Sequence, residues 1–346
     1  MNLPGLSVRH LLGIASLPSE DILTIFAAAD RMKADFLSTR TDGDELTGKR
    51  IVNLFIEDST RTRNSFHLAQ IRLGALPLHV VGGGSSLSKG ETLLDTVRVI
   101  EAMGVDAFVL RHSAACAPHF LQDHTDAVLI NAGDGRHEHP TQALLDGYTM
   151  YCHWREDLAA GERPFAGRKV AIVGDITHGR VALSNIFALT RLGADVTLCG
   201  PPTLIPKGIE RLGVTVARRL DDALDAADAV IMLRMQLERQ SQSFVPSLGE
   251  YRRLYGLDRS KRSLLKSDAL VLHPGPINRG VELDSEIADS THSVVLEQVG
   301  NGVAVRMAVL SLLLRDRPNN GNGKSRGAAD HPIEQSTTHA HRTRSN

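Results

Sequence analysis

Hydroxyl and guanidinium groups are concentrated in the segment Ser-Thr-Arg-Thr-Arg at positions 59–63. An apolar run at 51–56 precedes it and predicts a buried strand, and a helical pattern follows as far as Gly74. The start of such a helix offers free backbone N–H groups and the positive end of the helix dipole, which suit a phosphate. The alternative is a Ser or Thr helix cap followed by solvated arginines. Because the segment directly follows a buried strand, we favour phosphate ligands at Ser59, Thr60, Arg61 and Thr62.

A second polar segment, His-Pro-Thr-Gln at 139–142, predicts another helix start, since proline suits the first helical turn and apolar residues follow. His139 and Gln142 are three positions apart and face the same way there. An imidazole can donate to a carbonyl oxygen, and a carboxamide oxygen can accept from an NH2 group. A capping histidine beside a surface glutamine explains this segment equally well when it is taken alone.

Three arginines follow predicted strands. Arg111 and Arg234 come directly after short apolar runs, and Arg180 begins a helix after a strand and a glycine-containing turn. Gln236 lies on the same side of an extended segment as Arg234. The carboxyl ends of strands are where open α/β sheets bind ligands. One such arginine usually forms a surface ion pair, whereas three at equivalent strand ends favour a shared anion site.

Two loops complete the set of candidate residues. The segment His-Pro-Gly-Pro at 273–276 lacks N–H donors at its prolines, so the backbone carbonyls of Gly275 and Pro276 are available to an amide NH2. A glycine- and serine-rich loop at 82–92 contains Lys89, whose ammonium group could close over a bound anion. The alternative for this loop is a solvated linker.

Together these segments resemble the aspartate carbamoyltransferase catalytic chain family over roughly residues 5–315. The Ser-Thr-Arg-Thr-Arg and His-Pro-x-Gln segments resemble carbamoyltransferases in general. Arg-x-Gln at 234–236 and His-Pro-Gly-Pro at 273–276 favour aspartate over ornithine as the acceptor. Further matching segments occur in the family's order at 88–92, 110–112, 133–146 and 173–181. The sequence departs from many relatives at Asp58, where they have proline, and at His67, where they have glutamate.

The resemblance implies transfer of the carbamoyl group from carbamoyl phosphate to the amine of L-aspartate, giving N-carbamoyl-L-aspartate and phosphate early in de novo pyrimidine (UMP) biosynthesis. It also implies a cytoplasmic homotrimer with shared active sites, in which Lys89 reaches into a neighbouring subunit. A larger assembly with regulatory chains or dihydroorotase stays open. So do two rival hypotheses: a carbamoyltransferase with another acceptor, such as ornithine, and a non-catalytic binding partner.

The resemblance and the charges of the substrates assign roles to the candidate residues. Negative charge develops on the carbonyl oxygen during attack by the amine, and Thr62, Arg111 and His139 are the expected donors to it. Glu57 is expected to orient the arginines. The leaving phosphate can take the amine proton, so no metal or cofactor is expected. The catalytic residues are then Arg61, Thr62, Lys89, Arg111 and His139; carbamoyl phosphate contacts Ser59, Thr60, Arg61, Thr62, Arg111, His139, Gln142, Gly275 and Pro276; aspartate contacts Lys89, Arg180, Arg234 and Gln236.

Composition limits the possible partners. The formal net charge of −1 favours neither nucleic acid nor an anionic membrane as a partner. The small-molecule substrates expected are the two that the resemblance implies. No apolar run is long enough to cross a bilayer, and the N-terminus lacks a signal-peptide pattern. Cys116, Cys152 and Cys199 are widely spaced without a C-x-x-C motif, which predicts reduced cysteines with neither a disulfide nor a zinc site.

The elements that must position these residues alternate between strand-like and helix-like segments, which predicts parallel βαβ units. The 346 residues suffice for two domains. We therefore expect an α/β fold with two doubly wound parallel-sheet domains joined by helices: 1–150 for carbamoyl phosphate and 151–289 for aspartate. By resemblance, a C-terminal helix at about 290–315 completes the first domain. Residues 318–346 are polar and predict a disordered tail.

Overall fold

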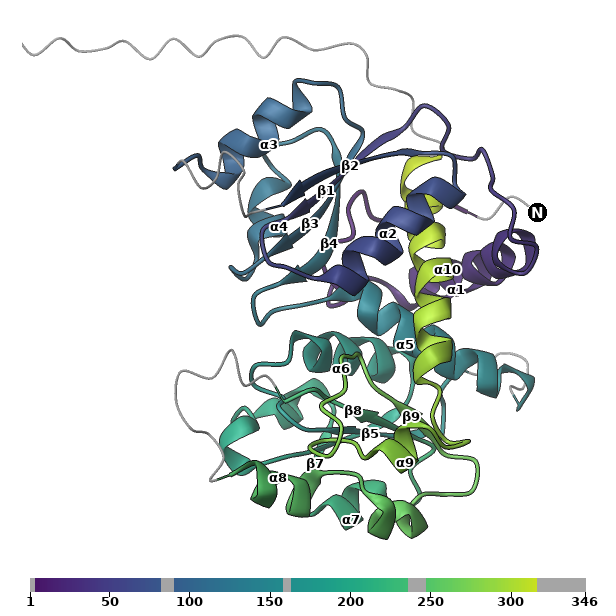
Figure 1. The fold of residues 1–346 in the computed structure, drawn as a ribbon, viewed down its shortest axis with the longest axis vertical. Helices are drawn as coiled ribbons and strands as arrows, with labels where there is room; N and C mark the ends of the chain where they lie inside the picture. The colour runs from purple at the N-terminus through teal and green to yellow at the C-terminus, as the bar shows by residue number, and fades with distance from the viewer. Residues whose placement is uncertain (1–3, 82–89, 158–162, 236–246, 316–346) are drawn as a thin grey trace, which may run out of the picture.

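The structure is a computed structural model that describes residues 4–81, 90–157, 163–235 and 247–315. It contains two parallel β-sheets, one in each half of the molecule, with helices α5 (Pro140–Trp154) and α6 (Arg180–Leu192) between them (Figure 1). Lys89, Gln236 and the predicted tail at 318–346 lie outside the described residues.

The first sheet has the strand order β2-β1-β3-β4, and all its pairs are parallel. The order reverses between β1 and β3, which makes this half doubly wound. Its elements are β1 (Arg50–Phe55), α2 (Thr60–Arg72), β2 (Leu76–Val81), α3 (Leu93–Glu101), β3 (Ala107–His112), α4 (Ala117–Leu121) and β4 (Val128–Asp134).

The second sheet has the order β7-β6-β5-β8-β9, again with every pair parallel, and reverses between β5 and β8. The predicted α/β fold with two doubly wound parallel sheets is therefore confirmed. The elements are β5 (Lys169–Val173), β6 (Asp195–Cys199), β7 (Thr215–Ala217), α7 (Leu220–Leu224), β8 (Ala229–Met232), α8 (Leu248–Tyr255), β9 (Leu270–Leu272) and α9 (Ser285–Ala288).

A single buried apolar cluster links the two halves. It includes Ile51 and Val109 from the first sheet and Ile172 and Ile231 from the second, together with residues of the helices between them. The long helix α10 (Val295–Leu314) packs against α1 (Ser19–Met32), α2 and α5 and runs alongside the first half (Figure 1). No helix in the described ranges is both long and apolar enough to cross a membrane.

Strand β1 is tied to the last turn of α2 by one polar residue, Asn53, within the apolar run. Asn53 is fully buried, and its amide donates to Oε1 of Gln70 in α2 at 2.7 Å. The amide of Gln70 donates back to Oδ1 of Asn53 at 3.0 Å. Because both buried amides are satisfied by each other, α2 is held at a defined position relative to the strand that precedes it.

Candidate active site

A cavity of about 390 Å³ lies where the carboxyl ends of the two sheets face each other. Its walls include the segments after β1 and β3 in the first sheet and after β5 and β8 in the second, together with the start of α5, the turn after β9 and one side of α10. Strands β1, β3, β5 and β8 flank the two positions where strand order reverses, which is where open α/β sheets bind ligands. Of the predicted site residues, the cavity is lined by Ser59, Thr60, Arg61, Thr62, Arg111, His139, Gln142, Arg180, Arg234, Gly275 and Pro276.

The start of α2 has no side-chain cap. Ser59 occupies the N-cap position of α2 with extended backbone angles, yet its side chain makes no capping hydrogen bond. Ser59 and Thr60 both line the cavity, and Thr62 in the first turn is buried. Because the Ser59 hydroxyl makes no capping hydrogen bond, it is available to a ligand at the positive end of the helix dipole. This geometry favours the phosphate hypothesis over the capping alternative.

Glu57 joins arginines from the two halves of the molecule. Its Oε1 accepts from Nη2 of Arg111 at 2.7 Å and also from Nη2 of Arg180. Nη1 of Arg111 donates to the backbone oxygen of Ala132 at 3.1 Å. The expectation that Glu57 orients arginines is therefore confirmed. This carboxylate holds two charged planar groups at defined angles across the cavity.

Gly133 allows these arginines to approach the backbone. It has φ +115°, and a β-carbon there would lie 3.0 Å from Nη1 of Arg111 and 3.0 Å from Cζ of Arg180. Sequence reasoning did not single out Gly133. Its signal was present, since glycine in a strand marks close approach by another group.

Positive charge dominates the cavity. Arg61, Arg111, Arg180, Arg234 and Arg306 line it, against the two carboxylates of Glu57 and Asp58. Desolvation lowers the pKa of Arg61, and the nearby cation of Arg234 lowers it further. An anionic ligand would relieve this repulsion.

The two positions at which the sequence differs from many relatives lie in different surroundings. Asp58 is exposed and lines this cavity. His67 forms a hydrogen bond through its Nδ1 with Nε2 of His79 at 2.9 Å.

His139 is fixed by contacts between the halves. It precedes the first residue of α5 and is buried, and its backbone N–H donates to Oγ of Ser184 in α6 at 2.9 Å. That hydroxyl donates to Oε2 of Glu138 at 2.9 Å, which also accepts from the N–H of Ile14 at 2.6 Å. The imidazole is thereby presented to the cavity from a rigid backbone.

The buried carboxylate of Asp146, which sequence reasoning missed, holds the side chain of Gln142 at the cavity wall. Asp146 accepts from the amides of Gln142 at 2.8 Å, Gln298 at 2.7 Å and Asn185 at 2.8 Å. Burial raises the pKa of Asp146 to about 6, against the lowering effect of these bonds and of Arg306. Because the Gln142 amide group points at Asp146, its carboxamide oxygen is the atom left to accept from a ligand NH2 group.

The same network reaches the turn at 273–276. Oε1 of Gln298 accepts from the N–H of His273 at 2.9 Å, and Nδ1 of His273 accepts from the N–H of Gly275 at 2.8 Å. Nε2 of His273 then donates to Glu282 at 3.1 Å. Gly275 has φ +64°, and a β-carbon there would lie 3.0 Å from Cζ of Arg61. The turn is therefore held against the phosphate side of the cavity.

Arg306 is a second lining residue that sequence reasoning missed. Its guanidinium lies 5.1 Å from the ring centroid of Phe66 and donates to Oγ of Ser65 at 3.0 Å. Burial lowers the pKa of Arg306 to about 10, so the group is charged at neutral pH. An arginine inside the apolar run of α10 was the signal that could have identified it.

Comparisons with known proteins agree with this geometry. Residues 9–152 match the aspartate/ornithine carbamoyltransferase, carbamoyl-P binding domain, and residues 166–313 match the Asp/Orn binding domain of the same family. The chain is 52% identical over 305 residues to the aspartate carbamoyltransferase catalytic subunit of Myxococcus xanthus, across 88% of this chain and 99% of that protein.

Solved structures are similar over the same region. Aspartate transcarbamoylase from Trypanosoma cruzi in complex with carbamoyl phosphate has a TM-score of 0.79 and 29% identity, covering 90% of this chain and 97% of that one. The same enzyme with carbamoyl phosphate and aspartate has a TM-score of 0.78 and 28% identity, covering 90% and 96%. This chain belongs to the aspartate/ornithine carbamoyltransferase family.

Proposed function

We propose that this chain is an aspartate carbamoyltransferase that converts carbamoyl phosphate and L-aspartate into N-carbamoyl-L-aspartate and phosphate. The observation that carries the proposal is the single cavity in which an open helix start, five arginines and His139 converge from two sheets. Relatives at about half identity named aspartate carbamoyltransferase catalytic subunit support aspartate as the acceptor, as does Arg234 at the end of β8.

The reaction brings several anions together, and the arginines offset their repulsion. Ser59, Thr60 and Arg61 would bind the phosphate at the start of α2, with Arg111 on its other side. The amine attacks the carbonyl carbon, and Thr62, Arg111 and His139 donate to the oxygen on which charge develops. The leaving phosphate accepts the amine proton. Most of the acceleration then comes from alignment and fixed charges.

Two further contacts would orient the carbamoyl group. The carboxamide oxygen of Gln142 and the carbonyls of Gly275 and Pro276 would accept from its NH2. Asp146 and Gln298 hold these acceptors in place through the network described above. If the NH2 and the carbonyl oxygen of the carbamoyl group exchanged places, these hydrogen bonds would be lost. The site therefore distinguishes the two groups, because acceptors surround the NH2 and donors surround the oxygen.

Arg180 and Arg234 would hold the two carboxylates of aspartate, together with Lys89 and Gln236. Arg234→Ala tests this division. Loss of one charge-assisted bond predicts a rise in KM for aspartate of about 10- to 100-fold, with a much smaller change for carbamoyl phosphate. Equal losses for both substrates would contradict the assignment.

We also propose that the active enzyme is a cytoplasmic homotrimer acting in pyrimidine biosynthesis, with Lys89 completing a neighbour's site. Inactive Lys89→Ala chains mixed with inactive Arg61→Ala chains should regain activity after dissociation and reassembly, since some hybrid sites receive both intact residues. Exchange demonstrated by mass without any return of activity would place the lysine in its own chain's site. A larger assembly would appear as added mass in the purified native complex.

The decisive assay offers the purified protein carbamoyl phosphate with either aspartate or ornithine. We expect equal amounts of N-carbamoyl-L-aspartate and phosphate with aspartate, and only background turnover with ornithine. A preference for ornithine would overturn the choice of acceptor. Absence of turnover with every amine tested, in a folded protein of confirmed mass, would support a non-catalytic member of the family.

A further inference from the structure

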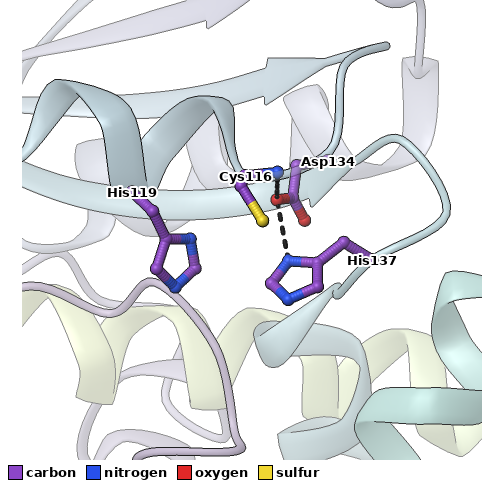
Figure 2. A group of neighbouring side chains, drawn as sticks. All are labelled: Cys116, His119, Asp134 and His137. Atoms are coloured by element: carbon purple, nitrogen blue, oxygen red, sulfur yellow. Dashed lines mark hydrogen bonds and ion pairs between the residues drawn. The ribbon is translucent and has the colours of Figure 1, made fainter.

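Four metal-ligating side chains meet outside the arginine-lined cavity (Figure 2). Cys116 and His119 lie at the start of α4, Asp134 ends β4, and His137 lies in the loop before α5. One ligand atom from each lies within 4.8 Å of all the others. In a tetrahedral zinc site with bonds of about 2.0–2.3 Å, ligand atoms lie about 3.3–3.8 Å apart. Small side-chain rotations would therefore suffice to close a site around one ion.

The donor set fits a borderline-soft cation. A thiolate, two imidazoles and a carboxylate are all ligands that Zn²⁺ accepts in four-coordinate sites. Thiolate and carboxylate together neutralise a divalent ion, so binding would leave no net charge at the cluster. The competing explanation is an Asp134–His137 hydrogen bond of 3.0 Å beside an unrelated thiol. Three observations favour a metal site.

The first is the orientation of Asp134, which is fully buried. Its Oδ1 accepts from the amide of Asn131 at 2.9 Å and from the N–H of Glu138 at 3.0 Å. Its Oδ2 faces the N–H of Cys116 at 2.7 Å and the ring of His137. Carboxylates that ligate metals are held in this way by hydrogen bonds from outside the site.

The second observation is the backbone at Cys116, which has φ +60° and ψ +13°. Residues with a β-carbon rarely adopt this left-handed conformation, where glycine is favoured. Cysteine at this position therefore destabilises the fold relative to glycine. A bond from its thiolate to a metal ion would offset that cost.

The third is His119, whose Nδ1 is buried and has no hydrogen-bond partner among the residues that the structure describes. Its ring meets that of His137 edge-on at a centroid distance of 5.3 Å. Both imidazoles face the thiol and the carboxylate (Figure 2). Buried polar atoms are almost always partnered, so this nitrogen indicates a missing ligand or a ring that turns on binding.

We propose that Cys116, His119, Asp134 and His137 form a binding site for one divalent transition-metal ion of the Zn²⁺ class. On binding, the Sγ–H bond of Cys116 breaks, its proton passes to solvent, and Sγ bonds to the metal while both histidines bind as neutral rings. The ion cross-links the segment after β3 to the segment before α5. These segments already touch, since the N–H of Gly135 donates to the oxygen of His112 at 2.9 Å.

The sequence predicted no zinc site because the cysteines form no pair. A mixed site with one cysteine has no such signature: its ligands come as two pairs with spacing three, Cys116 with His119 and Asp134 with His137. The two pairs are brought together only by the parallel pairing of β3 with β4.

Cobalt binding tests the proposal, because a cobalt–thiolate bond gives a charge-transfer absorption band that imidazoles and carboxylates do not. The full chain is stripped with a chelator and titrated with Co²⁺ and Zn²⁺. We expect one ion per chain, the thiolate band with Co²⁺, and its loss on adding excess Zn²⁺. His119→Asn and His137→Asn should weaken binding at least about tenfold. Cys152→Ser and His124→Asn, which alter a half-buried cysteine and a histidine outside the cluster, should keep the band and the stoichiometry.

Cys116→Gly separates ligation from folding. Glycine suits the left-handed backbone, so this variant should fold at least as well as the wild type without metal. It should show no thiolate band, and Zn²⁺ should raise the thermal unfolding midpoint of the wild type but not of this variant. Equal affinity and equal midpoints for the two proteins would overturn the site and leave an ordinary Asp134–His137 pair. The readouts do not involve carbamoyl transfer, so the outcome is independent of the proposed activity.

Discussion

Two histidines on one loop, His137 and His139, lie in opposite chemical surroundings. His139 faces a cavity with five arginines, where an imidazole serves as a hydrogen-bond donor to an anion or carbonyl. His137 lies against a buried carboxylate, a thiol and a second imidazole, whose lone pairs suit a cation. The residue type is the same, and the charges of the neighbouring side chains decide what each one can bind.

Both surroundings are built on the ends of the same two strands. Strand β3 carries Arg111 into the cavity and is followed by Cys116, while β4 ends in Asp134 and leads to His139. A parallel sheet brings the carboxyl ends of its strands to one edge, so a single edge can hold two sites that differ in charge. Variants that alter one site and not the other therefore test this comparison directly.

Arg61→Ala should have the largest effect. It removes a cation beside the phosphate position, and we expect turnover to fall by about 10³-fold while the fold survives. Arg63→Ala is the matched control, because Arg63 lies in the same helical turn but does not line the cavity. Steady-state kinetics with both substrates checks this. Near-normal use of carbamoyl phosphate by folded Arg61→Ala protein would show that the helix start is not the phosphate site.

His139→Asn and His137→Asn should differ in which property they lose. Removing a donor to the developing oxyanion predicts a fall in kcat of about 10²-fold for His139→Asn, with cobalt binding retained. His137→Asn should weaken cobalt binding and have the smaller effect on kcat. Parallel measurement of kcat and cobalt affinity checks both variants. If the two substitutions changed both properties equally, the sites would form one unit and the comparison would fail.

Local sequence was enough to predict the helix start at Ser59, the arginines after strands and the turn at 273–276. Each depends on residues within one strand–turn–helix unit, where periodicity and turn chemistry are informative. Observed elements follow the predictions closely: the apolar run predicted as a strand at 51–56 is β1 (Arg50–Phe55), and the helical pattern stopping at Gly74 is α2 (Thr60–Arg72). The packing of the closing helix was expected only by resemblance.

Residues that depend on distant partners could not be predicted in this way. Asp146 and Gln298 are 152 positions apart and meet only because α10 packs on α5. The site roles of Lys89 and Gln236 stay predictions, since both lie outside the described residues.

Adding a β-carbon at Gly275 should weaken carbamoyl phosphate binding, with an effect smaller than those of the two substitutions above. Gly275→Ala places a methyl group 3.0 Å from the guanidinium of Arg61 and strains a backbone with φ +64°. Gly280→Ala is a matched control, because Gly280 also has positive φ but an added β-carbon meets nothing within 4 Å. We expect carbamoyl phosphate affinity to fall about tenfold more in the first variant, which corresponds to about 1.4 kcal/mol. Equal losses would attribute the effect to backbone strain alone.

The smallest expected effect is on the pH dependence of the free energy of unfolding, and it distinguishes two buried carboxylates, Asp134 and Asp146. Asp134 hydrogen-bonds an imidazole, whereas Asp146 is held by three neutral amides, and burial raises the pKa of Asp146 from 3.8 to about 6. Between about pH 4 and pH 6 the folded protein therefore binds the Asp146 proton more strongly than the unfolded chain does. The free energy of unfolding should fall as pH rises through this window, by about 1 kcal/mol per pH unit from this group.

Denaturant unfolding of the wild type and of Asp146→Asn at several pH values between 4 and 6 measures this contribution. The substituted side chain cannot titrate. Its oxygen can still accept from Gln142 and Gln298, but its NH2 group faces the NH2 donor of Asn185, so the variant should be less stable near neutral pH. The difference in unfolding free energy between the two proteins should nevertheless change with pH in the predicted direction: it grows as pH falls. Asp123→Asn, at an exposed position, should follow the wild type. A difference between wild type and Asp146→Asn that stays constant across the window would show that folding does not raise the pKa of Asp146.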